Sequence, residues 1–247
     1  MTTEIVEELT FKHSDLNNLN VDARCAFFQA AILLTDLRYF DLALHQHYQF
    51  LKKSCNRHTL EIGVYFSQVT LLFSHLAGIL CEANNVLRQS YYSGNVSKEF
   101  DSKLSPESKE ALSRIKAYFS KRDNLATVIR NNFGFHYDRA KIAEFADSFP
   151  PDWDHRTYLT GLLNNAFLEF GQIASTNALC KATGATNGPE GLLCLFKELH
   201  GQLLKDFVIF FHGLLQAISK SLPFKSQKVR ASLSANSPAL FVHFKIP

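Results

Sequence analysis

A short segment in the middle of the chain combines residue types that can act on a phosphodiester. Arg130, Asn131 and His136 lie within the string VIRNNFGFHYD, residues 128–138. Arginine offers a planar, permanently charged fork for a phosphate group. A histidine that titrates near neutral pH can take the proton from a ribose 2′-hydroxyl or protonate the leaving 5′-oxygen. Because RNA carries its own nucleophile, this set predicts RNA cleavage that needs neither a metal ion nor another cofactor.

The same segment also predicts a local break in a helix. On an unbroken α-helix, residues six positions apart point about 240° apart, so Arg130 and His136 would diverge. Asn131, Asn132 and Gly134 weaken α-helix formation, and a kink or bulge there would turn both side chains toward one pocket. Cleavage also needs an acid and a base, while each chain supplies one histidine. We therefore expect a homodimer that brings two sites together.

Plainer interpretations of this segment remain open. Arg130 could form a surface ion pair with Asp138, and Phe133, Phe135 and Tyr137 could be core residues instead of platforms for bases. Residues 109–141 contain eight basic and three acidic residues, a balance of +5 against +3 for the whole chain. That excess predicts a basic cleft that attracts RNA, or a solvated helix face.

Helical periodicity dominates the rest of the chain and predicts the elements that must position this segment. Apolar residues recur every three or four positions over residues 27–51, 62–87, 112–129, 159–173 and 193–217. The fold class is therefore all-α: an up-and-down bundle of about five long helices with a kinked motif helix and an irregular C-terminal tail. The unbroken stripe of residues 62–87 is a second reason to expect a dimer.

The breaks between the stripes predict the domain organisation. Ser105-Pro106-Glu107 is a helix start, residues 93–105 read as a surface loop, and we expect no strand before residue 238. Residues 1–221 form a single helical domain. Residues 222–247 form a basic tail whose apolar end, residues 239–246, could dock on the bundle or on a partner.

Composition excludes several classes of protein. Of the 247 residues, 46% are hydrophobic, which argues against extensive disorder. The apolar windows 69–81 and 207–218 are too short to span a bilayer, and no secretion signal is visible, so we expect no membrane partner.

The cysteines are odd in number and irregularly spaced, typical of reduced thiols in a cytoplasmic protein; they are Cys25, Cys55, Cys81, Cys180 and Cys194. His45 and His47 cannot share a metal ion on one helix face, and His200 reads as a hydrogen-bonded core residue.

The Arg130-Asn131-x4-His136 motif resembles the R-x4-6-H motif of the HEPN superfamily, in its abortive-infection and uncharacterised bacterial types. The resemblance implies a helical bundle, usually dimeric, with the motifs of two protomers at a shared cleft. It also implies a HEPN-like core at about residues 59–180 of the helical domain. It implies that Arg130 and His136 are the catalytic pair and that Asn131 orients the site or contacts phosphate. Some members place an acidic residue on an earlier helix, for which Glu61 and Glu82 both remain candidates.

Three functions remain to be separated. The first is a metal-independent RNA endonuclease, in a toxin or antiphage role, with RNA as substrate and a possible neutralising partner protein. The second is a non-catalytic HEPN-like module that binds a protein or a nucleic acid. The third is a purely structural helical dimer. The complete motif favours the first over the third.

Overall fold

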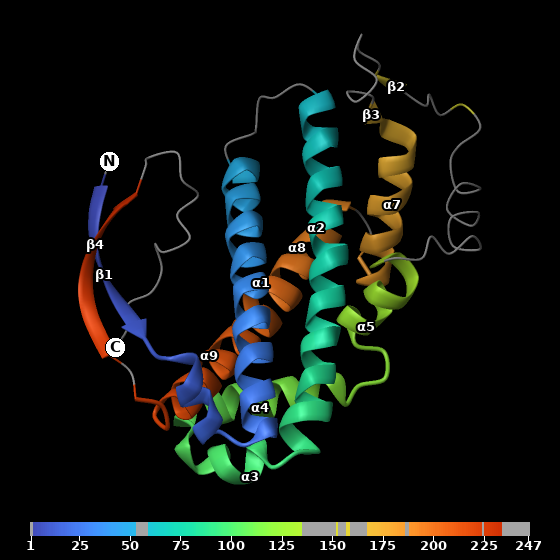
Figure 1. Cartoon of the computed structure of the whole chain (residues 1–247). Helices are drawn as coiled ribbons and strands as arrows, with labels where there is room; N and C mark the ends of the chain where they lie inside the picture. The colour runs from blue at the N-terminus through green and yellow to red at the C-terminus, as the bar shows by residue number, and fades with distance from the viewer. Residues whose placement is uncertain are drawn as a thin grey trace.

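The protein is an all-α helical bundle with a short β-ribbon beside it (Figure 1). The structure, a computed structural model, describes residues 2–52, 59–134, 152, 157–158, 167–185, 188–223 and 225–233. The all-α prediction is confirmed.

Two long helices form the centre of the bundle. They are α1 (Val21–Lys52) and α2 (Thr59–Val86), and a π-helical turn, η2 (Leu87–Tyr92), extends the second. The predicted stripe of α2 is buried inside this same chain, through Val69, Phe73, Leu76, Leu80 and Ala83. Since these side chains are already covered, the stripe gives no reason to expect a second copy of the chain.

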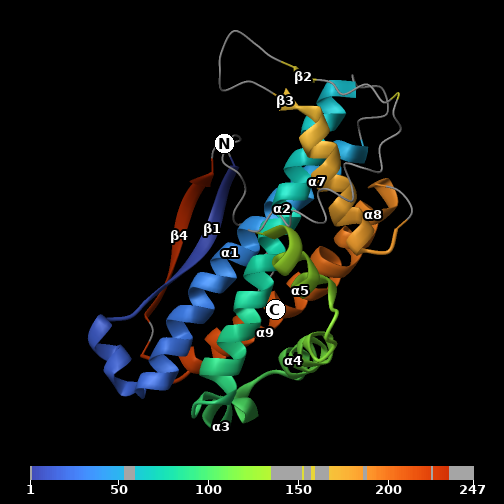
Figure 2. The same cartoon turned by 90° about the vertical axis from the view of Figure 1, so that its right-hand side faces the viewer.

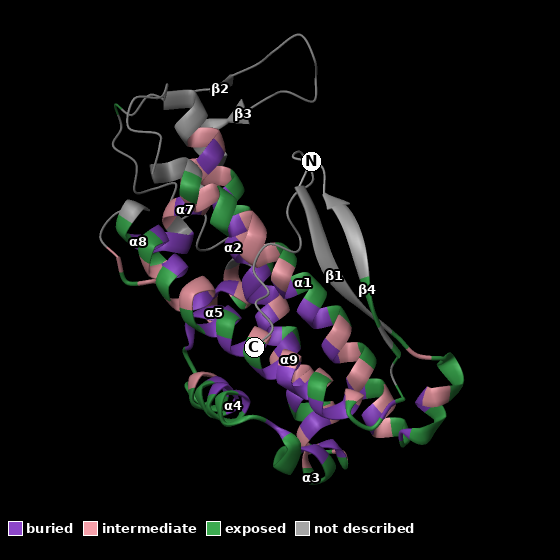
Figure 3. Cartoon of the chain, turned by 90° about the vertical axis from the view of Figure 1, so that its left-hand side faces the viewer, coloured by how far each residue is buried: buried purple, intermediate pink, exposed green. Residues whose placement is uncertain are grey.

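A third long helical segment crosses behind α1 and α2 in Figure 1. It consists of α8 (Gly188–Leu195), the π-helical stretch η6 (Phe196–Leu204) and α9 (Lys205–Ser219), which follow one another without a break. Phe207, Phe210 and Phe211 are fully buried on α9, and the rings of Phe207 and Phe211 stack with centroids 5.8 Å apart. These buried rings make the core of the bundle around α9 aromatic. Figure 3 colours each residue of the chain by its burial.

The predicted helix over residues 112–129 is two helices. The first, α4 (Pro106–Phe119), begins at the predicted cap, where Ser105 Oγ accepts a hydrogen bond from the Ser108 amide at 3.1 Å. The second, α5 (Leu125–Ile129), begins after a turn at residues 120–124. Residues 93–105 are wrongly predicted as a loop, because α3 (Val96–Phe100) and η3 (Asp101–Lys103) lie there. Their helical turns bury Val96, Phe100 and Leu104 against the bundle.

The prediction of no strand before residue 238 is also wrong. Strand β1 (Thr2–Thr10) pairs antiparallel with β4 (Lys225–Leu233), with Thr2 opposite Leu233 and Thr10 opposite Lys225. The tail is therefore regular over residues 225–233, whereas residues 239–246 lie outside the described residues. A second, minimal pair joins β2 (Thr157–Tyr158) to β3 (Phe167–Leu168) and leads into α7 (Glu169–Ala182). The predicted helical stripe of residues 159–173 overlaps α7 only from Glu169 onward, where α7 begins.

Two glycines let helices approach closely. A Cβ atom on Gly213 of α9 would lie 2.0 Å from Ser108 Oγ on α4, and one on Gly191 of α8 would lie 2.8 Å from Cys180 Cα on α7.

The helix Gly63–Tyr92 is long and apolar enough to cross a bilayer by length and composition, and 56% of its most apolar window is buried in the fold. A core helix meets the same criterion, so this finding is weak support for a membrane role.

Candidate functional site

The Arg130 segment leaves α-helical geometry where the sequence predicts a break. Residues Arg130–Gly134 form a single π-helical turn, η4, that follows α5 directly. A π-helical turn inserts extra backbone into a helix and is frequent at functional sites. This turn is the local irregularity that the asparagines and the glycine predict.

Side chains from α4 and the preceding turn fix the start of α5. Asn124 Oδ1 accepts a hydrogen bond from the Thr127 amide at 3.0 Å, as an N-cap residue does. The hydroxyl oxygen of Tyr118 accepts one from the Ala126 amide at 3.0 Å and donates to Glu198 Oε1 at 2.9 Å. Burial raises the pKa of Tyr118, so this phenol stays protonated and can donate. The helix that leads into Arg130 is therefore anchored at its first turn.

Arg130 meets an acidic residue of α2. Its Nη2 atom donates to Glu82 Oε1 at 2.5 Å, and this ion pair joins η4 to the central helix. The two side chains are 39% and 57% exposed, so the pair lies at the surface and other groups can reach it. Of the two acidic candidates on this helix, Glu82 is the partner of Arg130. Among the described residues, Arg130 has no other hydrogen-bond partner.

A buried thiol lies behind this ion pair. Cys81 precedes Glu82 in α2, and burial raises its pKa, although a hydrogen bond with Thr127 and the charge of Arg130 oppose this change. A thiol with a raised pKa stays protonated and is a poor nucleophile. Burial and the hydrogen bond with Thr127 make Cys81 a packing residue of the contact between α2 and α5.

The structure describes part of the predicted site. It brings together Arg130, Asn131 and Glu82, with Asn131 exposed directly beside the arginine in η4. His136 lies outside the described residues, as do Phe135, Tyr137 and Asp138, so neither the catalytic pairing nor the alternative Arg130–Asp138 ion pair is tested here.

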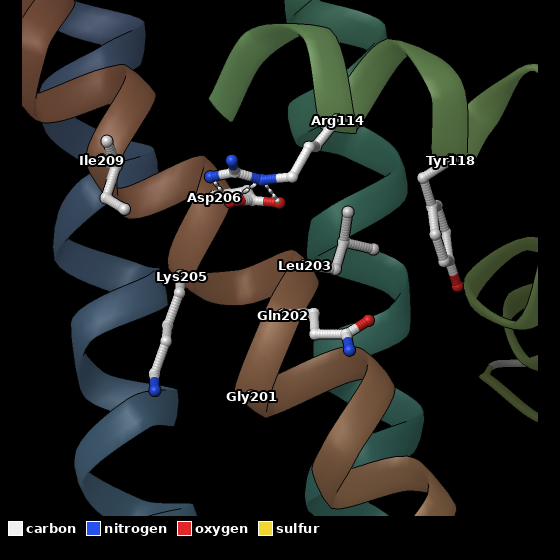
Figure 4. A pocket seen from close by; sticks show the side chains of 8 residues that line it. All are labelled: Arg114, Tyr118, Gly201, Gln202, Leu203, Lys205, Asp206 and Ile209. Atoms are coloured by element: carbon white, nitrogen blue, oxygen red, sulfur yellow. Dashed lines mark hydrogen bonds and ion pairs between the residues drawn. The ribbon is translucent and has the colours of Figure 1, made fainter. Parts of the chain in front are cut away.

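A second polar cluster lies between α4 and α9 (Figure 4). Arg114 donates to Asp206 from Nε at 3.0 Å and from Nη2 at 2.7 Å, and its Nη1 donates to Glu110 at 2.7 Å. The hydrogen bonds with Asp206 raise the pKa of Arg114. A groove of about 540 Å³ runs beside this pair, lined also by Tyr118, Gln202 and Lys205. The spacing of Glu110 and Arg114 is visible in the sequence, but no sequence signal indicates Asp206, 92 residues away.

This geometry weakens the prediction of a basic cleft. Three of its cations already have partners: Arg114 with Asp206 and Glu110, Arg130 with Glu82, and Lys116, whose Nζ lies 4.2 Å from the centroid of the Tyr92 ring. Three further cations, Lys109, Lys121 and Arg122, are exposed and form no ion pair with a described residue. Among the described residues of this segment, three of the six cations are therefore left without such a partner.

His200 is largely buried, in agreement with its prediction as a core residue. Its Nε2 atom lies 2.8 Å from Asp41 Oδ1 of α1, off the line of a well-aligned hydrogen bond, and the ring contacts that of Phe196 edge-on. The contact with His200 lowers the pKa of Asp41 below its ordinary value.

Within the described ranges, no three His, Cys, Asp or Glu side chains are grouped closely enough to hold a metal ion.

Comparison of the chain with protein-family models, with curated proteins and with solved structures gives no match.

Proposed function

We propose that the protein is a metal-independent RNA endonuclease of HEPN type, with Arg130 and His136 as its catalytic residues. The observation that carries the proposal is the placement of Arg130. This arginine begins a π-helical turn at the surface, beside an exposed Asn131, with its guanidinium held by Glu82. Single π-helical turns are frequent at functional sites.

The chemistry assigns a role to each residue. Glu82 holds one nitrogen of the guanidinium, and the remaining N–H groups of Arg130 can bind the scissile phosphate as a preorganised donor. Asn131 contributes an amide that can orient the same phosphate. His136 takes the 2′-hydroxyl proton, and the His136 of a second chain protonates the leaving 5′-oxygen, so that a 2′,3′-cyclic phosphate and a free 5′-hydroxyl are formed. We propose a homodimer for this reason alone.

Purified protein incubated with single-stranded and structured RNAs in excess EDTA tests this function. We expect cleavage with 2′,3′-cyclic phosphate ends, and we expect the His136→Ala variant to lose it while it keeps its helical circular dichroism. A strict requirement for a divalent metal ion would contradict the mechanism. His58→Ala, a histidine change away from the motif, is the matched control and should cleave normally.

One observation favours a second candidate, a HEPN-like module that binds a partner without catalysis. Arg130 and Arg114 both carry carboxylate partners in the folded chain, as structural arginines do. If the protein binds RNA or a protein partner but cleaves no RNA under any of these conditions, and His136→Ala leaves that binding unchanged, the non-catalytic function is the correct one.

The proposed activity also suggests a cellular role. An endonuclease that cleaves cellular RNA harms the cell that makes it, which fits a cytoplasmic toxin or an antiphage effector held in check by a neutralising partner protein. Expression of the chain in a bacterial host should arrest growth, and His136→Ala should relieve the arrest.

A further inference from the structure

Helix α1 has a second apolar face that points away from the core. Its buried face is formed by residues that recur every three or four positions, namely Ala23, Ala26, Ala30, Leu33, Leu34, Leu37 and Leu44. On the opposite side, Val21, Phe28, Ile32 and Tyr39 are 64%, 46%, 62% and 59% exposed. At about 100° per residue, these four side chains lie within about 40° of a single line along the helix. We call these four residues the α1 stripe.

The dimensions of the α1 stripe favour a narrow occupant. It runs from residue 21 to residue 39, or about 27 Å at 1.5 Å per residue. Four roughly half-exposed side chains offer on the order of 400 Å² of apolar surface, which is about half of what each partner buries in a stable interface between folded proteins. A single extended segment of chain fits such a strip better than a second folded bundle does.

The β-ribbon begins near the Val21 end of the α1 stripe. Phe11, which follows β1 directly, packs edge-on against Phe27 of α1 with ring centroids 5.9 Å apart. Figures 1 and 2 show the ribbon rising from there on the α1 side of the bundle. Strand β4 ends with Leu233 opposite Thr2, at the far end of the ribbon. Residues 234–247 continue from that point and lie outside the described residues.

The sequence after β4 matches the stripe in pattern and in length. Residues 234–238 (SANSP) are rich in residues that favour turns, and residues 239–246 (ALFVHFKI) follow them. In an extended strand, Leu240, Val242, Phe244 and Ile246 share one face, while Phe241, His243 and Lys245 share the other. Eight extended residues span about 27 Å, which is the length of the stripe. A chain that turns back after Leu233 would run from the Tyr39 end of the stripe toward the Val21 end.

We infer that residues 239–246 dock as an extended segment on the α1 stripe of the same chain, with Leu240, Val242, Phe244 and Ile246 against Val21, Phe28, Ile32 and Tyr39. Such docking covers both apolar surfaces at once. It also supports a two-stranded ribbon that is marginally stable by itself, because it ties the ribbon's far end to the bundle. This inference is independent of the proposed ribonuclease activity.

Cys25 is a natural reporter of this docking. Its thiol is exposed and lies between Val21 and Phe28 along the same side of the helix. We expect N-ethylmaleimide to alkylate Cys25 slowly in the full chain, and about tenfold faster in the Phe244→Asp variant, as measured by mass spectrometry of the peptide that contains it. Phe241→Asp, which places the same charge on the opposite face of the strand, is the matched control and should change the rate less than about twofold.

Three outcomes would overturn the inference. The first is an equal rate of alkylation in the unmodified chain and in Phe244→Asp. The second is an equal acceleration by Phe241→Asp, which would mean that the apolar face of the strand does not make the contact. The third is loss of protection on dilution from about 100 µM to about 1 µM, which would assign the docked segment to a second copy of the chain. Circular dichroism checks that the bundle stays folded in both variants.

Discussion

The Nη2 atom of Arg130 lies 2.5 Å from Oε1 of Glu82, although the two residues are 48 positions apart in the chain. This ion pair joins the π-helical turn of the motif to the central helix of the bundle. Because α2 is packed in the core of the bundle, the pair ties the guanidinium to a fixed helix at an exposed surface. A residue on α2 therefore belongs to the candidate site, together with the motif.

Removing the charge of Glu82 should affect the site more than the fold. For Glu82→Gln we expect RNA cleavage to fall by about tenfold, because the guanidinium loses its orienting partner. The free energy of unfolding should change by less than about 1 kcal/mol, since both side chains are more than a third exposed to solvent. Cleavage rates and urea unfolding measure the two quantities. Glu107→Gln, at an exposed glutamate of α4, is the control and should change neither.

Arg130→Lys separates catalysis from binding. The lysine keeps the positive charge but lacks the planar fork, so turnover should fall on the order of a hundredfold or more while RNA affinity changes little. Single-turnover cleavage and filter binding give the two values. Equal, small losses in both would mean that Arg130 belongs to a general basic surface. Unfolding of the variant would indicate that the Glu82 pair is structural.

The proposed composite site requires two chains. Light scattering at micromolar concentration should give a mass of about twice 28.0 kDa. Because the apolar stripe of α2 is buried in its own chain, the dimer must form through other surfaces. An excess of His136→Ala chains should inhibit the unmodified protein, because a mixed dimer keeps only one of the two histidines that the shared site needs. A monomer that still cleaves RNA would contradict the shared site.

The Arg114–Asp206 pair should matter for stability and not for RNA. Asp206 is 8% exposed, so Arg114→Ala leaves a buried carboxylate without its partner and should cost about 2–3 kcal/mol of unfolding free energy. The exposed Glu110→Ala should cost under about 0.5 kcal/mol. The double variant Arg114→Ala/Asp206→Ala should be more stable than Arg114→Ala alone, as urea denaturation would show. If Arg114→Ala left the free energy of unfolding unchanged, the pair would have no structural role.

The contact of Asp41 with His200 should appear in acid unfolding. It lowers the pKa of Asp41 below its ordinary value of 3.8, so its stabilising effect is present above that pH and is lost as the pH falls through the lower pKa of the folded chain. His200→Gln should therefore move acid unfolding to higher pH, by a small amount because Asp41 is 46% exposed. Circular dichroism against pH measures the midpoint, and coincident curves would exclude the effect.

Local signals in the sequence predict much of the helical frame. The stripes of α1, α2 and the α8–α9 segment follow from spacing alone, because each buries one face. The cap at Ser105 and the break of helical geometry at Asn131–Gly134 are also local, since each depends on the conformational preferences of a few neighbouring residues.

Long-range pairings are what the sequence leaves open. The choice of Glu82 over Glu61 depends on which turn of α2 faces η4, and periodicity does not give the register between two helices. Asp206 lies 92 positions from Arg114, and no local pattern connects them. In residues 93–105, polar surface positions outnumber the buried Val96, Phe100 and Leu104, so short helical turns look like a loop. Strand β1 looks helical or irregular until its partner is known.

The pairing of β1 with β4 makes the ribbon a late event in folding. Thr10 and Lys225 meet across 215 positions of chain, and closing a loop of that size costs entropy that no local contact repays. Once α1 and α9 have packed together, the distance left to close is short and most of that cost has already been met. We therefore expect the β1–β4 pairing to form last during folding, after the helices have packed, and to open first during unfolding.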